Sequence, residues 1–357
     1  MKPRNWTMNR RHVLLIVGLV LSGVFLYLFL RGMDWASLRA DLGRVNLWIL
    51  ALATVVDFVA FLVMSIRAQM LFQPLFQFGF GEMFRSMLIA YSGNNVLPAR
   101  AGEFMRAAFL IRRSGLPTAS VAGVIAVERL MDAVVVITLA LVALPLTMGS
   151  IGAGFYVIAG AVLATFAGIV MASRHPVASR RTVRRLASGL GKRMRNKVSI
   201  LLDRFFEGIQ GISSSRMLLY AGLLTMLNWL LTATSIYIWI VACGVKLAWY
   251  HAFVVLGSIA VGNAVPSSPG NIGTFHYFVR SALELLGVGQ AAAGTVAIVG
   301  YFTKVPFTVI GLVYGMPGLL RERRNRAGKK EVDTNSPAST PPLDPGLAGS
   351  ETYESAA

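Results

Sequence analysis

The sequence predicts an all-α polytopic membrane protein with about six transmembrane helices and two re-entrant half-helix hairpins, arranged as an inverted repeat. Three observations lead to this fold class. The 357 residues are 55% hydrophobic and only 14% charged, with a mean hydropathy of +0.63, whereas soluble domains carry about 25% charged residues. Several charge-free runs exceed the roughly 18 apolar residues that mark a spanning helix. Finally, two polar turns with the same order of Gly-Asn, Pro and Gly interrupt apolar stretches.

The first half of the chain is predicted to read span, span, hairpin, span, beginning in the cytoplasm. A basic N-terminus, residues 1–12, precedes an apolar run over residues 13–30. We interpret this run as a retained first span, because no small-residue cleavage site follows it. The second span is expected over residues 47–66 and the third over residues 119–144. The first hairpin lies between them, so the first repeat is expected to cover residues 13–144.

The second half is predicted to repeat this order from the opposite side of the membrane. A fourth span is expected over residues 155–172, and a basic cytoplasmic loop, residues 173–216, follows it because Lys and Arg mark the inner side. The fifth span is expected over residues 217–245 and the sixth over residues 295–320, with the second hairpin between them entering from outside. Inverted repeats with broken helices are a recurring plan of transporters. The second repeat is therefore expected to cover residues 155–320.

The C-terminal segment, residues 321–357, is basic at first and then rich in Pro, Ser and Thr, which predicts a disordered cytoplasmic tail. The flippase-like transmembrane domain is expected to cover residues 13–320. Both termini are then cytoplasmic, and the protein is expected in the plasma (inner) membrane.

The net charge of +18 does not indicate nucleic-acid binding, because the basic residues lie in short loops beside apolar segments, where they orient the chain and attract anionic lipids. A single cysteine, Cys243, excludes an internal disulfide and a multi-cysteine metal site. No metal or other cofactor is predicted. Catalytic motifs such as H-E-x-x-H, a P-loop or a nucleophile elbow do not occur. A glycosyltransferase based on Asp34 and Asp41 is a weaker alternative, because no large outer domain would hold an acceptor. We predict no enzymatic activity.

The turn of the first hairpin carries the first group of candidate substrate-binding residues. Two of its arginines, Arg100 and Arg106, offer the planar fork that suits a lipid phosphate. Glu103 is expected to pair with one of them or to bind a cationic group. Asn94 and Asn95 either satisfy backbone groups at the helix break or contact the ligand. The candidates in this turn are Asn94, Asn95, Pro98, Arg100, Gly102, Glu103 and Arg106.

The third span carries a charged cluster, Glu128, Arg129 and Asp132. Ionisable groups inside a membrane are costly and either pair or face a cavity. The spacing allows a self-neutralising cluster that fixes helix packing, or a charged wall of a headgroup or proton path. Lys304 aligns with Asp132 in the second repeat, which predicts that the two meet near the pseudo-twofold axis. Asp57 in the second span is expected to make a hydrogen bond between helices.

The second hairpin supplies the remaining candidates. Its Pro and Gly residues shape the turn, and its polar side chains could contact a headgroup. The imidazole of His276 is interpreted as a packed, hydrogen-bonded group rather than as a proton carrier. The candidates are Asn263, Ser268, Pro269, Gly270, Asn271, Gly273 and His276.

These motifs together resemble the flippase-like transmembrane region of lysylphosphatidylglycerol synthases, which also occurs in stand-alone proteins. The resemblance covers most of residues 13–320. It is carried by N-x-x-P-x-R-x-G-E-x-x-R at 95–106, E-R-x-x-D at 128–132 and S-P-G-N-I-G-T-F at 268–275. It implies movement of a lipid, or of a lipid-linked headgroup, between the leaflets of a bacterial or archaeal membrane. The partners that it implies are membrane lipids, with anionic or lipid-linked headgroups, and an enzyme of envelope-lipid, hopanoid or glycosyl transfer.

Two departures from the family pattern bear on the function. The soluble aminoacyl-transfer domain of the full-length synthases is not found after Leu320, so synthesis of lysyl-lipid is not expected. Asn271 and His276 replace the Gly and Glu of many members, so a cationic headgroup held by that Glu is not expected either. The sequence thus predicts a lipid flippase, with a non-catalytic scaffold for a lipid-modifying enzyme as the alternative. A flippase requires a polar cavity that joins both hairpins and the third span, whereas a scaffold requires the same charges sealed in pairs.

Overall fold

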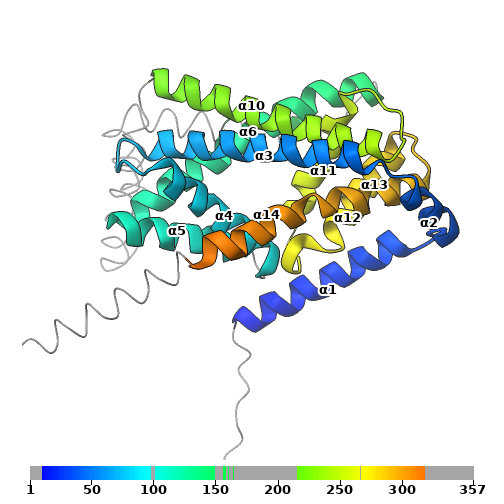
Figure 1. Ribbon diagram of the computed structural model, residues 1–357, viewed down its shortest axis with the longest axis horizontal. Coiled ribbons are helices and arrows are strands. Elements are labelled where there is room, and N and C mark those ends of the chain that lie inside the picture. The colour runs from blue at the N-terminus through cyan, green and yellow to red at the C-terminus, as the bar shows by residue number, and fades with distance from the viewer. Residues whose placement is uncertain are drawn as a thin grey trace, which may run out of the picture. The chain divides into compact units, whose positions relative to one another are not determined.

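The computed structural model describes most of the chain between residues 10 and 317. The chain divides into two units, Met1–Pro317 and Gly318–Ala357, and every described residue belongs to the first. Within this described part all regular elements are helical (Figure 1). The described residues are 10–97, 101–148, 156, 157, 160, 164, 215–265 and 267–317.

Among the described residues, four helices are long and apolar enough to cross a membrane. They are α3 (Leu47–Phe72), most of α6 (Thr118–Met148), most of α10 (Ser215–Ala242) and the span that α13 (Gln290–Phe302) makes with the segments after it. Counting the bent pair of α1 and α2 as one span gives five. The predicted fourth span, residues 155–172, lies outside the described residues at all but four positions. The predicted membrane fold class is confirmed, and the exact number of six spans stays a prediction.

The last span, predicted over residues 295–320, begins earlier, at Gln290, and continues as one helical run to Gly315. A turn at Thr303, whose φ and ψ remain helical, separates α13 from α14 (Lys304–Ile310). A π-helical segment, Gly311–Gly315, follows. Such wide turns occur mostly as single-turn insertions in α-helices and are frequent at functional sites. Lys304 follows the turn at Thr303 directly.

The N-terminal helix α1 (Arg10–Leu30) meets α2 (Trp35–Gly43) at an angle of 86°. The Asp34 carboxylate caps α2 by accepting hydrogen bonds from Ser37 and from the Ala36 N–H. The same bonds, that from the Ser37 side chain first, hold the pKa of Asp34 below its usual value. The buried Arg280 guanidinium donates to the Phe29 carbonyl near the end of α1, where helix carbonyls lack partners. This hydrogen bond links the bend between α1 and α2 to the second hairpin.

Both predicted hairpins are present. The first consists of α4 (Phe80–Val96) and α5 (Ala101–Ser114), which approach so closely that a Cβ at Gly102 would lie 2.0 Å from the Ala90 carbonyl oxygen. The second consists of α11 (His251–Ala264) and α12 (Thr274–Leu285), joined through a single 3-10 turn, Pro269–Asn271. Each polar turn therefore ends one short helix and begins the next.

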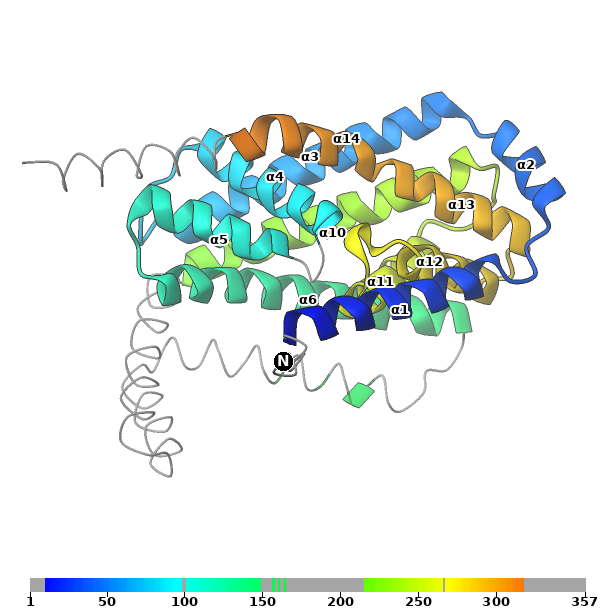
Figure 2. The ribbon, with the colours of Figure 1, turned by 90° about the horizontal axis from the view of Figure 1, so that it is seen from below.

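The helices of the two halves pack reciprocally. The second-span helices α3 and α10 pair along their length, as Figures 1 and 2 show. Helix α4 of the first hairpin packs on α14 and the π-helical segment of the second half, while α11 of the second hairpin packs on α6 of the first half. Each hairpin thus packs on the last span of the other half, which is the arrangement expected of two repeats related by a twofold axis. The repeat boundaries themselves stay a prediction.

Candidate functional site

A cavity of about 390 Å³ lies between the two hairpins and the long helices. Its walls come from both hairpins, from α3, α6 and α10, from the turn at Thr303 and from the start of α14. The charged side chains in its lining are Asp57, Glu103, Arg129, Asp132 and Lys304. Its side-chain amides are Asn94, Asn95, Asn228, Asn263 and Asn271, and its aromatic rings are Phe61, Tyr91, Trp229, Trp239, Phe275 and Phe307.

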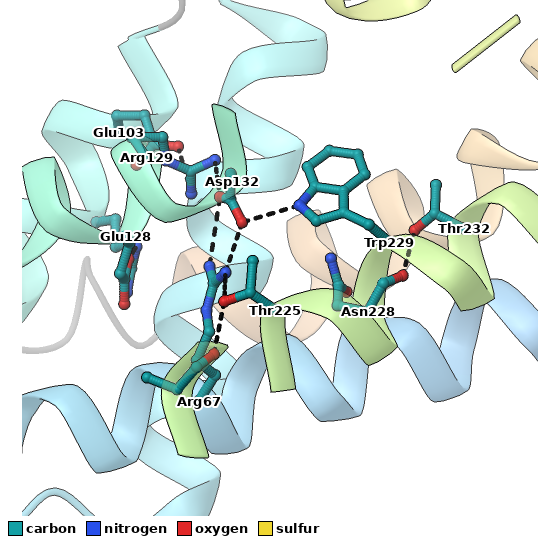
Figure 3. Close-up of polar contacts among 11 residues, drawn as sticks. Arg67, Glu103, Glu128, Arg129, Asp132, Thr225, Asn228, Trp229 and Thr232 are labelled. Carbon is teal, nitrogen blue, oxygen red and sulfur yellow. Dashed lines mark hydrogen bonds and ion pairs between the residues drawn. The ribbon is translucent and has the colours of Figure 1, made fainter. Parts of the chain in front are cut away.

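Asp132 is the most connected of these charged groups (Figure 3). It accepts two hydrogen bonds from the Arg67 guanidinium of α3, at 2.5 and 3.3 Å, and one from the Trp229 indole N–H of α10 at 3.1 Å. Arg129 lies 3.4 Å away on the same helix. Arg67 is fully buried and also donates to the Thr225 hydroxyl. A buried carboxylate is stabilised by such pairing, and the network joins α3, α6 and α10.

Arg129 connects Asp132 to the first hairpin. Its guanidinium lies 3.3 Å from one oxygen of Glu103, while 45% of its side chain remains exposed within the cavity wall. The other Glu103 oxygen, Oε2, is buried and accepts no hydrogen bond from the residues that the structure describes. Arg129 therefore compensates two carboxylates and still faces the cavity.

Arg106 and Glu128 lie apart from the cavity lining. Both side chains are fully buried, and the guanidinium donates to the two carboxylate oxygens at 2.6 and 3.0 Å. The bidentate pair joins α5 to α6. The predicted charged cluster is thus divided, because Glu128 is sealed in a pair while Arg129 and Asp132 reach the cavity. The structure contains a sealed pair, as a scaffold would need, and a cavity with charged side chains in its lining, as a flippase would need.

Lys304 lies on the opposite wall. Its ammonium is 3.5 Å from the centre of the Phe275 ring and 5.4 Å from that of Tyr301, a cation–π arrangement. Asp57 of α3 lines the same cavity. The sequence assigned Asp57 only a helix contact and expected Lys304 to meet Asp132. Both acids line the same cavity as Lys304, and Asp132 is paired with Arg67.

The second hairpin places its predicted residues on two sides. Asn263 accepts a hydrogen bond of 2.8 Å from Asn271, and both line the cavity. Ser268 and Gly273 face α1 instead, since the Ser268 N–H donates to the Ser22 hydroxyl and a Cβ at Gly273 would lie 2.4 Å from the Ser22 carbonyl oxygen.

The turn between Ser268 and Gly273 is shaped by Pro269 and Gly270. Pro269 begins the 3-10 turn, and Gly270 has φ +71°. His276 packs among the rings of Phe29, Phe275 and Tyr301. Its Nδ1 is buried and makes no hydrogen bond to the described residues, so the hydrogen-bonded imidazole that the sequence suggested is packed but not bonded at this nitrogen.

The amides of the first hairpin bond to the protein itself, and a contact with a ligand stays a prediction. Asn94 accepts a hydrogen bond from the Gly102 N–H at 3.0 Å, across the helix break. Asn95 donates to the Thr308 hydroxyl of α14 at 2.7 Å. Both residues also line the cavity. Pro98 and Arg100 lie outside the described residues.

Sequence reasoning missed the polar face of α10. Thr225, Asn228 and Thr232 recur at helical spacing in a span that was considered only for its lack of charge. Residues three and four apart share a helix face, and this spacing was the signal that could have found them. Trp229 and Arg67 were missed because their partner, Asp132, is distant in sequence. Within the described part of the chain, no group of three or more His, Cys, Asp or Glu side chains could hold a metal ion.

Comparison with known proteins agrees with this architecture. The family model described as "Lysylphosphatidylglycerol synthase TM region" matches residues 15–311. The chain is also 25% identical over 345 residues to "Glycosyltransferase AglD" of Haloferax volcanii, covering 87% of this chain and 55% of that protein. It thus spans little more than half the length of this relative. The family match covers both hairpins, α6 and the cavity-lining residues, and it confirms the resemblance that the motifs carry. The chain belongs to the lysylphosphatidylglycerol synthase TM region family.

Proposed function

We propose that this protein is a lipid flippase, which moves a lipid or a lipid-linked headgroup between the leaflets of the plasma (inner) membrane. The cavity would hold the headgroup while the acyl or isoprenoid chains stay in the surrounding lipid. Broken helices that meet in the interior of the membrane supply such sites in transporters of inverted-repeat architecture. Envelope-lipid biogenesis is the setting that this function implies.

The observation that carries the proposal is the cavity together with the charged side chains in its lining. The cavity joins residues of both hairpins, such as Glu103 and Asn271, to the charged side chains of α6 and Lys304. Lining an interior cavity with ionisable groups is costly in a membrane protein, so such groups commonly mark a substrate or ion path. A scaffold would need the sealed pair of Arg106 and Glu128 but would not need the cavity.

Leaflet exchange of labelled lipids in proteoliposomes tests this function. The lipids should include anionic, zwitterionic and isoprenoid- or hopanoid-linked classes. We expect exchange of one class by the full chain, and a reduction of at least about tenfold in Arg129→Gln, because this variant leaves Glu103 and part of the Asp132 charge uncompensated in the cavity. Arg113→Gln is the matched control, since Arg113 pairs with Glu82 at an exposed site outside the cavity lining. Equal exchange in the two folded variants would contradict a passage along Arg129, and no exchange by folded wild-type protein would contradict the flippase.

A second candidate function is a non-catalytic accessory domain for a glycosyltransferase or another lipid-modifying enzyme. The observation that favours it is the similarity to "Glycosyltransferase AglD", because this chain matches only about half of that protein. An accessory domain would bind the lipid acceptor without moving it. Absence of exchange with every lipid class, from folded wild-type protein, would favour this candidate over the flippase.

A further inference from the structure

The charges around the cavity compensate one another. Arg129 lies between Glu103 and Asp132, at 3.3 and 3.4 Å, and Arg67 covers Asp132 from the other side. These four side chains carry two positive and two negative formal charges. Lys304 and Asp57, which also line the cavity, add one formal charge of each sign. Among the described residues, a charged headgroup would therefore meet no excess of opposite charge, and burying it would cost desolvation energy without a matching gain.

One aromatic face of the lining that would suit a cationic headgroup, that of Phe275, is already occupied. Aromatic faces attract ammonium groups within about 6 Å of the ring centre. The Lys304 ammonium lies 3.5 Å from the centre of the Phe275 ring, so the chain itself supplies the cation there. A second ammonium would be repelled by Lys304.

The groups that remain available suit hydroxyls. The Asn228 side chain lines the cavity and makes no hydrogen bond within the described part of the chain, so its amide offers donors and an acceptor together. The Oε2 atom of Glu103 is a buried acceptor without a donor among the described residues. A hydroxyl both donates and accepts, whereas a phosphate oxygen only accepts and an ammonium only donates. A cluster of hydroxyls satisfies both Asn228 and Glu103.

Two tryptophan rings beside these groups are held in fixed orientations. The Trp229 indole N–H donates to Asp132 at 3.1 Å, and the Trp239 N–H donates to the Ser235 hydroxyl at 3.1 Å. Trp239 is also packed against Gly300, where a Cβ would lie 2.3 Å from the ring. With their polar edges engaged, both residues contribute apolar ring surface to the cavity lining. The C–H faces of a sugar ring pack on such surfaces while its hydroxyls reach the amides.

We propose that the cavity binds the uncharged, polyhydroxylated headgroup of a glycolipid in preference to a phosphate or ammonium headgroup. This inference rests on the proposed function and names the class of its cargo. The cavity volume of about 390 Å³ lies within the roughly 300–1,000 Å³ of small-molecule sites. The sugar would lie against Trp229, with hydroxyls bonded to Asn228 and Glu103.

Equilibrium binding tests the cargo class separately from transport. The full chain in lipid nanodiscs is titrated calorimetrically with hexyl glucoside, hexyl phosphate, hexylammonium and hexanol, and the heats of empty nanodiscs are subtracted. We expect hexyl glucoside to bind saturably and at least about tenfold tighter than hexanol. Hexanol measures the contribution of the hexyl tail alone. Hexyl phosphate and hexylammonium should not exceed hexanol.

Variants assign this binding to the cavity. Asn228→Leu should weaken the glucoside about tenfold, because the hydroxyls lose their amide partner. Thr234→Val, on the same helix but outside the cavity lining, should leave the binding unchanged. Glu103→Gln leaves the network of Arg129, Arg67 and Asp132 with one excess positive charge, so it should gain saturable binding of hexyl phosphate. A misfolded variant would not gain a ligand.

Two results would overturn the inference. One is wild-type binding of hexyl phosphate or hexylammonium that equals or exceeds that of the glucoside, which would assign a charged cargo to the same cavity. The other is folded wild-type protein that binds none of the three probes above hexanol. In both cases the leaflet-exchange experiment still decides, by itself, whether the protein moves lipids.

Discussion

Replacing Glu128 with Leu should strongly destabilise the protein, because it leaves the Arg106 guanidinium buried without a counter-charge. Both side chains are fully buried and are joined by hydrogen bonds of 2.6 and 3.0 Å. Removing one partner of a buried ion pair costs roughly 3–5 kcal/mol, since the remaining charge keeps its desolvation penalty. We therefore expect the free energy of unfolding of Glu128→Leu to fall by about this amount.

The double variant Arg106→Met, Glu128→Leu should recover most of this loss. Replacing both partners of a buried pair by apolar groups of similar volume is often neutral or stabilising. Unfolding by sodium dodecyl sulfate in mixed micelles, followed by circular dichroism, measures these differences. The control is Arg113→Met, which removes a pair whose side chains are 54% and 26% exposed and should cost at most about 1 kcal/mol.

The same variants decide whether Arg106 and Glu128 contact the cargo, as the sequence suggested. If their role is to join α5 to α6, the double variant should retain leaflet exchange as well as stability. A double variant as unstable as the single one would refute the energetic argument. A stable double variant that lacks leaflet exchange, measured beside an active Arg113→Met control, would indicate that Arg106 and Glu128 take part in transport.

Three further predictions concern the turns. Gly102→Ala should destabilise the first hairpin by about 2 kcal/mol or more, because its Cβ would meet the backbone of α4. The control is Gly81→Ala, at an open position of the same helix pair, which should be neutral or slightly stabilising in the same unfolding assay. Gly270→Ala should cost about 1–3 kcal/mol through its φ of +71° and a contact of 2.5 Å with the Tyr301 hydroxyl, and Tyr301→Phe should restore only the part due to the contact. Asp34, which caps α2, has a lowered pKa in the folded protein, so the stability that its carboxylate contributes is present above the unfolded-state pKa of about 3.9 and is lost as the pH falls through the lower folded-state pKa. We therefore expect the first backbone amides of α2 to exchange hydrogen faster in acid, and we expect no such acid-dependent change in Asp34→Asn.

The hairpins were predictable because their signals are local. In both, Gly and Pro interrupt an apolar pattern, and the structure shows why glycine is required at one position of each hairpin. Gly102 admits the backbone of α4, and Gly270 adopts a positive φ beside the Tyr301 hydroxyl. The residues that indicate a helix break therefore lie within about ten positions of it in the sequence. The described part of the chain has helical hairpins at both predicted positions.

The partners of the charged groups were not predictable, because they depend on which helices become neighbours. Asp132 has Arg129 three residues away, and the sequence suggested that pairing. Its strongest bond is to Arg67, 65 residues earlier, which the sequence placed at the inner end of a span. The pairing of α3 with α10 and their contacts with α6 create this site. The same dependence hid Asn228 and Trp229, whose helical spacing becomes informative only once α10 has a polar neighbour.

The reciprocal packing of the hairpins explains why one cavity receives residues from the whole chain. Helix α4 rests on the last span of the second half so closely that a Cβ at Gly311 would lie 2.6 Å from the Leu88 carbonyl oxygen. Helix α11 rests in turn on α6, the last span of the first half. The two polar turns then meet, and a Cβ at Gly270 would lie 3.2 Å from the Asn95 carbonyl oxygen. Neither half could enclose the cavity alone, because each hairpin contributes one wall and depends on the other half for its support. A headgroup bound there contacts both halves at once, which is the condition under which a ligand can couple their movement.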